Sequence, residues 1–157
     1  MTARLPVCSV DASELDQVRA LLRAYAGSLP FALDFQGFED ELETLPGAYA
    51  PPRGALLAAR DGDNRLAGCV ALRPMDDETC ELKRLYVRPE QRGSGLGRRL
   101  VEAIVDAARE RGYRRMRLDT TRGMEAAQAL YEELGFREIA PYTHNPVAGT
   151  RFLQLEL

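Results

Sequence analysis

The chain has 157 residues, of which 45% are hydrophobic and 29% are charged, and its formal net charge is −3. These values exclude a disordered chain, and the length predicts one domain over residues 1–157. The slight negative charge gives no support for nucleic-acid binding. No apolar run reaches the roughly 20 residues of a membrane-spanning helix, and the N-terminal segment lacks the apolar region of a signal peptide. We therefore expect a cytoplasmic protein that does not enter a membrane.

The cysteines and the histidine give little sign of a metal site. Cys8, Cys69 and Cys80 form no C-x-x-C pair, and His144 is the one histidine. An odd number of scattered cysteines argues against both a disulfide framework and a zinc site. We expect no metal, and we expect Cys69, which lies in an apolar run, to be a small buried side chain.

The N-terminal third shows the apolar spacing of helices. A capping-box pattern begins at Ser13, and apolar residues then recur every three or four positions as far as Gly27. This pattern predicts a helix over residues 13–26. A second, shorter helix is predicted over residues 37–45, whose apolar side chains share one face.

Strand patterns follow in the middle of the chain. Residues 55–60 and 65–73 are apolar segments separated by Asp-Gly-Asp-Asn, which favours a hairpin turn because these residues tolerate positive φ. Residues 80–87 are the third strand candidate. The sheet is therefore expected to begin antiparallel.

Helices and strands alternate in the C-terminal half. Helical spacing returns at Leu100 and ends at Gly112, and residues 124–134 predict a further helix that ends at Gly135. Three more strands are predicted, at residues 114–119, 136–139 and 150–157. This order predicts an α/β (α+β) fold with one mixed, partly antiparallel sheet and helices on its faces.

A glycine-rich segment lies between the third strand candidate and the following helix. It reads Arg92-Gly93-Ser94-Gly95-Leu96-Gly97, and Arg98 follows directly. Unpaired backbone N–H groups and the positive end of the helix dipole meet at such a point, and glycines let an anion approach the backbone. The segment therefore predicts a phosphate-binding loop. The alternative, a turn that binds nothing, is disfavoured by the alternating glycines and the flanking arginines.

The glycine spacing limits the phosphate ligand. The Gly-Lys-Ser/Thr ending of a P-loop is absent, which removes the main support for ATP or GTP hydrolysis. The spacing G-x-G-x-G also departs from the dinucleotide fingerprint G-x-G-x-x-G, although Asp119 lies where a ribose-binding acid would be expected. A nucleotide-binding protein that takes NAD or ATP remains an alternative.

Two segments resemble the signatures of one enzyme family. Residues 81–97, ELKRLYVRPEQRGSGLG, resemble the acetyl-CoA signature of the GNAT N-acetyltransferases, and residues 127–136, AQALYEELGF, are similar to the second signature of that family. The two segments occur in the order and spacing of the family. The resemblance implies a GNAT-like twisted sheet flanked by helices on both faces. It also implies transfer of an acetyl group from acetyl-CoA to a primary amine.

The resemblance implies roles for the coenzyme A-binding residues. Three residues would pair their backbone with the pantetheine arm as an added strand: Leu85, Tyr86 and Val87. The backbone of residues 92–98 would hold the pyrophosphate, and Ala127 would face the coenzyme. Met124 stands where many members have an asparagine, so that contact is not carried over. Met124 would instead pack against the coenzyme or fill the core.

The resemblance also implies two catalytic residues. Tyr131 would protonate the departing thiolate, and Glu81 would act as the base, directly or through water. The alternatives are a core aromatic for Tyr131, and a solvated carboxylate or a partner of Lys83 for Glu81. A backbone N–H near residues 85–87 would stabilise the oxyanion. No Ser/His/Asp or Cys/His set is convincing, which is consistent with direct attack in a ternary complex. A non-catalytic acyl-CoA sensor remains an alternative.

The acceptor, an amine of a small molecule or peptide, is not identified by the sequence. In the family its pocket would come from residues 28–36 and 141–149, with five candidate lining residues: Phe31, Phe35, Tyr142, His144 and Asn145. Acidic residues between Asp34 and Glu43 could attract an ammonium group, although such a run is usually a solvated helix face. The resemblance also leaves room for a homodimer, and no segment identifies its interface.

Overall fold

The computed structural model describes residues 5–33 and 37–157. Within these ranges the strands form one seven-stranded sheet in the order β1-β2-β3-β4-β5-β7-β6. The strands are β1 (Val7–Ser9), β2 (Ala55–Arg60), β3 (Leu66–Pro74), β4 (Thr79–Val87), β5 (Arg115–Thr120), β6 (Arg137–Ile139) and β7 (Arg151–Glu156). The helices are α1 (Leu15–Ser28), α2 (Phe38–Thr44), α3 (Leu96–Glu110) and α4 (Glu125–Glu133).

The sheet is antiparallel at every strand pair except β4 with β5. The hairpin expected between the first two apolar segments joins β2 to β3, with Asn64 at a φ of 61° in its turn. The parallel pair is joined by the crossover helix α3, as a parallel connection requires. The predicted mixed, partly antiparallel sheet is therefore confirmed.

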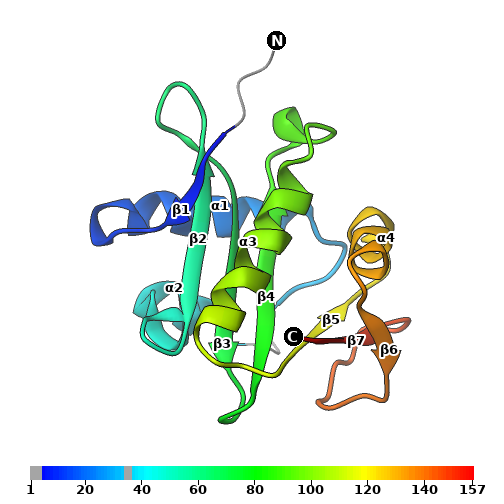
Figure 1. Cartoon of the computed structure of the whole chain (residues 1–157). Coiled ribbons are helices and arrows are strands. Elements are labelled where there is room, and N and C mark those ends of the chain that lie inside the picture. The colour runs from blue at the N-terminus through cyan, green and yellow to red at the C-terminus, as the bar shows by residue number, and fades with distance from the viewer. Residues whose placement is uncertain (1–4, 34–36) are drawn as a thin grey trace.

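Helices cover both faces of the sheet, as predicted. Figure 1 shows α3 running along one face beside β4, while α1 crosses behind the same strands. Alternate residues of β3 point to opposite faces. Val70 and Leu72 belong to the core that α3 covers, and Cys69 and Ala71 belong to the core that α1 and α2 cover. Cys69 is fully buried, as the sequence predicted.

The beginning and end of α1 differ from the sequence prediction. The capping residue is Asp11 rather than Ser13, because the Asp11 carboxylate accepts from the Ser13 N–H and the Asp11 N–H donates to Glu14. A short 3-10 turn at Ala12–Glu14 precedes the helix. The prediction that Gly27 ends the helix was wrong, since the helix continues to Ser28. A glycine ends a helix only where the backbone turns left-handed, and Gly27 does not.

No sequence pattern predicted β1. This strand has three residues, Val7–Ser9, and two of them are exposed, so no apolar alternation marks it. It pairs with residues Leu57–Ala59 of β2, about fifty positions away in the sequence. An edge strand of this length depends on the neighbour that it pairs with, which no local pattern specifies.

A bulge interrupts β4 where it pairs with β3. Val70 lies opposite two residues, Arg84 and Leu85, and Arg84 has a φ of 61°. A non-glycine residue in the left-handed region is uncommon and is typical of bulges beside functional sites. The extra residue breaks the alternation of the strand. Lys83 and Arg84 therefore both lie on the face of α1 and α2, and Leu85 packs against the other core.

The parallel strands β4 and β5 separate along their length. Their pairing is confined to Thr79–Glu81 and Arg115–Arg117. Figure 1 shows the two strands close together at one end and diverging toward the start of α3. No strand of the described chain pairs with residues 85–87 on the side of β5. The fold thus leaves backbone N–H and C=O groups of β4 facing an opening in the sheet.

Candidate functional site

A cleft of about 590 Å³ occupies the opening beside β4. The end of α1, the end of β4, the glycine-rich loop and the start of α4 form its walls. Most of the predicted coenzyme-binding residues line it: Leu85, Tyr86, Val87, Arg92, Gly93, Gly95, Leu96, Gly97, Met124 and Ala127. The fold thus brings the two signature segments, about thirty residues apart, to the two sides of one cleft.

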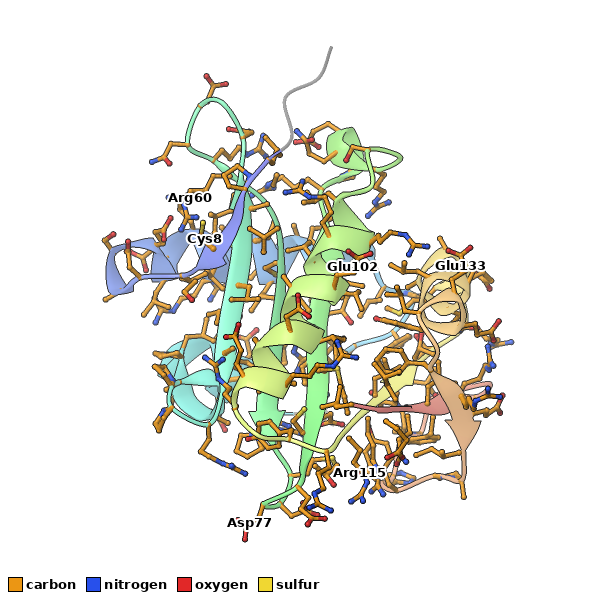
Figure 2. All side chains as sticks on the ribbon, in the orientation of Figure 1. Cys8, Arg60, Asp77, Glu102, Arg115 and Glu133 are labelled. Carbon is orange, nitrogen blue, oxygen red and sulfur yellow. The ribbon has the colours of Figure 1, made fainter. Side chains whose placement is uncertain are left out.

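Ser94 and Arg98 are the two predicted residues that do not line the cleft. The Ser94 hydroxyl donates to the carbonyl oxygen of Gln91 at 2.5 Å. The Arg98 side chain forms ion pairs with Glu102, at 3.6 Å, and with Glu133. Figure 2 shows Glu102 on α3 and Glu133 on α4, so Arg98 links these two helices. The Arg98 guanidinium therefore connects the two helices that form walls of the cleft. Only the backbone N–H of Arg98 lies at the start of α3.

The glycine-rich loop ends at the N-terminus of α3. Gly93 and Gly95 have φ values of 81° and 84°, a region that side chains rarely adopt. The first intrahelical hydrogen bond runs from the Arg99 N–H to the Gly95 carbonyl at 3.2 Å. The N–H groups of Leu96 and Gly97 precede this bond, so they stay available to a ligand at the positive end of the helix dipole. This arrangement binds phosphate.

A small cavity of about 60 Å³, here called the junction, continues the cleft into the protein. It shares four lining residues with the cleft, namely Tyr25, Leu85, Met124 and Ala127. It shares three others with a separate polar pocket on the α1 and α2 side of the sheet, namely Lys83, Arg84 and Asp119. The cleft, the junction and the polar pocket therefore adjoin one another along the gap between β4 and β5.

Tyr131 of α4 lines the junction. The residue is 5% exposed, and its ring packs against Phe136 with 5.4 Å between the ring centroids. Burial raises the pKa of Tyr131 above its ordinary value, so the hydroxyl keeps its proton throughout the neutral range. A protonated hydroxyl in this cavity can donate a proton or a hydrogen bond.

Tyr25 of α1 also lines the junction, and the sequence analysis missed it. Its ring lies 5.7 Å from that of Tyr86, and burial raises its pKa. In the sequence Tyr25 is one more apolar position of an amphipathic helix. Only the crossing of α1 behind β4 brings it to the gap.

The polar pocket has a volume of about 230 Å³. Its lining residues among those that the structure describes are all polar or charged: Glu41, Arg73, Glu81, Lys83, Arg84, Asp119, Thr143 and His144. They come from α2, β3, β4, β5 and the loop before β7. The described wall of this pocket is thus more polar than that of most ligand sites, which are predominantly apolar.

Glu81 lies in the wall of the polar pocket and is 3% exposed. The Arg73 guanidinium donates to Glu81 Oε1 at 2.8 Å, and the Tyr142 hydroxyl donates to Glu81 Oε2 at 2.7 Å. Glu81 is therefore a buried carboxylate that faces a pocket, not the solvated strand-end residue of the alternative interpretation. Tyr142 reaches the site through this hydrogen bond without lining the pocket itself.

Arg84 and Glu41 form a buried ion pair in the same pocket. The Arg84 Nε and Nη2 atoms donate to the two carboxylate oxygens of Glu41, each at 2.8 Å. Burial opposes ionisation of Glu41, but the hydrogen bonds and the charge of Arg84 outweigh it, so its pKa lies below the ordinary value. Glu41 thus points inward, whereas Glu39, Asp40 and Glu43 are exposed on α2.

The loop before β7 brings two of the predicted acceptor residues to the site. His144 lines the polar pocket, and the Asn145 amide donates to Asp119 Oδ2 at 3.0 Å. Phe31 instead packs against the core that α1 and α2 cover and lines none of the three cavities. Phe35 lies outside the described residues, as does Asp34.

Neither a metal cluster nor a membrane helix is found in residues 5–33 and 37–157. No three His, Cys, Asp or Glu side chains there are grouped as a metal site would need. In the same ranges no helix is long and apolar enough to cross a membrane.

Comparison with known proteins places the chain in a family. The acetyltransferase (GNAT) family profile matches residues 16–136. An uncharacterized N-acetyltransferase of Schizosaccharomyces pombe is 40% identical over 145 residues, which cover 92% of this chain and 89% of that relative.

Solved structures agree on the fold. A GNAT-family acetyltransferase from Staphylococcus aureus Mu50 superposes with a TM-score of 0.82 at 19% identity, covering 98% of this chain and 99% of that one. The acetyltransferase YncA from Salmonella typhimurium, solved with its cofactor acetyl-CoA, gives a TM-score of 0.74 at 18% identity, covering 98% and 94%. The family profile, the relative and the shared fold lead to one conclusion: this chain belongs to the GNAT family of acetyltransferases.

Proposed function

We propose that this protein transfers an acetyl group from acetyl-CoA to a primary amine by direct attack in a ternary complex. The observation that carries the proposal is the row of three adjoining cavities that runs from the glycine-rich loop, along the unpaired edge of β4, to the polar pocket. Coenzyme and acceptor would enter from opposite ends of this row. They would meet at the junction, where Tyr131 lies.

The cleft suits the pyrophosphate, the pantetheine arm and the thioester of the coenzyme. The N–H groups at the start of α3 suit the pyrophosphate, because they point out of the helix at its positive end. The amides of the pantetheine arm are peptide-like, so they suit the unpaired backbone of residues 85–87 as an added strand. A pantetheine arm that runs from the glycine-rich loop along β4 would place its thioester at the junction.

The residues around the junction supply what acyl transfer needs. Acetyl-CoA supplies the acetyl group as a thioester. The amine nitrogen forms a bond to the carbonyl carbon, and the carbon–sulfur bond breaks. A backbone N–H of β4 at the bulge stabilises the negative oxygen. Glu81 accepts the proton from the amine, directly or through water, and Tyr131 gives a proton to the departing sulfur.

Thermal unfolding of the pure protein tests coenzyme binding. Acetyl-CoA and CoA at 100 times their Kd should each stabilise the protein by about 2.7 kcal/mol. For a chain of this length that stabilisation raises the Tm by about 5–10 °C. NADH and ATP should give no comparable shift. A shift with NADH or ATP but not with CoA would favour the nucleotide-binding alternative, and a CoA shift without turnover of any amine would favour the sensor.

Replacing Glu81 with glutamine should lower kcat/KM for the acceptor by about 100-fold or more, because the amide cannot accept the proton. Glutamine keeps the volume of Glu81, an oxygen that can accept from Arg73, and an NH2 group that can donate to the Tyr142 hydroxyl. The Tm shift with acetyl-CoA should therefore stay as in the wild type. Tyr142→Phe is the matched control, since it removes one hydrogen bond to the carboxylate and leaves the base in place. Equal losses in the two variants would argue that Glu81 only positions the loop before β7.

A further inference from the structure

Asp119 lies near the end of β5, beside the gap in the sheet. β5 pairs with β4 only at Arg115–Arg117, so the rest of that edge of β5 faces the gap. On its other edge β5 pairs with β7, and Asp119 lies opposite Phe152 there. Asp119 lines both the polar pocket and the junction. It therefore lies where an acceptor that enters through the polar pocket would reach the thioester.

Asn145 of the loop before β7 orients the Asp119 carboxylate. The Oδ1 atom of Asn145 accepts from the Val147 N–H at 2.9 Å, so the other end of this amide is its NH2 group. The NH2 group donates to Asp119 Oδ2 at 3.0 Å. A carboxylate can accept about four hydrogen bonds. Asp119 is thus held by the loop and keeps the capacity to accept from the N–H groups of a substrate.

Glu81 occupies a different position. Its Oε1 atom accepts from Arg73 at 2.8 Å, and its Oε2 atom accepts from the Tyr142 hydroxyl at 2.7 Å. Glu81 lines the polar pocket and is not among the described residues that line the junction. An amine beside the thioester would therefore contact Asp119, and its proton would reach Glu81 through water.

Asp119 also lies close to Tyr131, the proposed acid. Burial raises the pKa of Tyr131 above its ordinary value, and the charges of Tyr25 and Asp119 add to the rise. Both Asp119 and Tyr131 line the junction. An amine bound to Asp119 and a thioester sulfur beside Tyr131 would therefore share one cavity of about 60 Å³.

The position of Asp119 does not suit the ribose-binding role of the nucleotide alternative. A ribose-binding acid has to lie beside the phosphate-binding loop. The glycine-rich loop lines the cleft, whereas Asp119 does not. The Asp119 carboxylate is therefore available to the acceptor and not to a nucleotide on the loop.

We propose that Asp119 binds the acceptor amine beside the thioester, attracting it as an ammonium ion and orienting the neutral amine for attack. The proposal rests on the acetyltransferase activity proposed above and adds a substrate-binding residue to it. The bound ammonium ion loses one proton to water. The nitrogen then bonds to the carbonyl carbon and passes a second proton through water to Glu81, and the carbon–sulfur bond breaks as the sulfur takes a proton from Tyr131.

Asp119→Asn tests the assignment, because it removes the negative charge and keeps the size of the side chain. Glycine, spermidine, tyramine and a peptide with a free N-terminus and a lysine are first screened with the wild type by thiol release from acetyl-CoA. For the best acceptor, Asp119→Asn should raise KM by about tenfold or more, which is the loss expected for one hydrogen bond between charged groups. The Tm shift with acetyl-CoA should stay as in the wild type, which also shows that the variant folds.

Two further variants separate binding from a structural role. Asp119→Glu keeps the charge and should recover most of the affinity for the amine. Asn145→Ala removes the partner of Asp119 and leaves the carboxylate in place, so it should raise KM by less than Asp119→Asn does. A KM in Asp119→Asn equal to that of the wild type, or an equal rise in Asn145→Ala, would overturn the assignment.

The wild-type measurements distinguish this proposal from the proposed function. Turnover of an amine together with an unchanged KM in Asp119→Asn would reject only the role of Asp119. No acetyl-CoA shift in the wild type would reject the acetyltransferase activity itself. A wild type that binds acetyl-CoA but turns over none of the four amines would overturn the assignment and favour the sensor.

Discussion

Replacing Tyr131 with phenylalanine should lower kcat by about 10²–10⁴-fold, the range that a positioned general acid contributes. Phenylalanine keeps the ring that packs against Phe136, so the core around α4 should remain intact. The Tm shift with acetyl-CoA should be nearly unchanged. The hydroxyl protonates the coenzyme sulfur during the reaction and does not hold the coenzyme in the cleft. Single-turnover thiol release together with thermal unfolding separates the two effects.

The matched control for this variant is Tyr25→Phe. Tyr25 lines the same junction from α1 and is also buried, so its hydroxyl is removed from a similar environment. We expect a small loss there if Tyr131 is the acid. A loss of the same size in both variants would assign the proton to neither tyrosine alone. A sensor protein would show no turnover in the wild type and no difference between the variants.

The direction of the pKa shift of Tyr131 gives a further check. Burial disfavours the phenolate, which raises the pKa of Tyr131, so the acid form persists as the pH rises. A buried thiolate also has a raised pKa, which keeps it able to take the proton. The rate of the wild type should therefore not fall between neutral pH and pH 9 through loss of the Tyr131 proton.

Replacing Glu41 with alanine should destabilise the fold by about 3–5 kcal/mol, the range measured when one member of a buried ion pair is removed. The side chain of Arg84 is 3% exposed, so water cannot replace the two hydrogen bonds to Glu41. For a chain of this length the Tm should fall by about 6–20 °C. Denaturant unfolding at neutral pH measures the change directly. Glu43→Ala, an exposed position of the same helix, should change stability by less than about 0.5 kcal/mol.

The ion pair of Glu41 and Arg84 predicts that the free energy of unfolding falls in acid. Because the pKa of Glu41 lies below the ordinary glutamate value of 4.5, the contribution of the ion pair to stability is complete above that pH and is lost as the pH falls below it. The stability difference between the wild type and Glu41→Gln should therefore narrow in acid. A difference that stays constant from neutral pH to well below 4.5 would contradict the pairing.

The local patterns predicted most of the elements because helix and strand periods are properties of neighbouring residues. The helix α3, the hairpin of β2 and β3, and the helix that carries Tyr131 all follow from spacing and turn residues. The glycine-rich loop before α3 could be predicted for the same reason, since its glycines and the helix start lie within six residues. The same short range explains why β1 was missed, because the strand that it pairs with lies about fifty positions away.

The sequence by itself determined the order of the elements from α1 onward, the glycine-rich loop and, through the resemblance, the family. Only the tertiary structure decided that Glu41 points inward to Arg84, that Glu81 binds Arg73 and Tyr142, and that Asp119 opens onto the junction. The physical reason is distance along the chain. The polar pocket is built from residues between 41 and 144. The role of each charged residue there depends on the other charges around it. Such a set leaves no period or motif in the sequence, because the bulge in β4 and the gap beside it bring its members together.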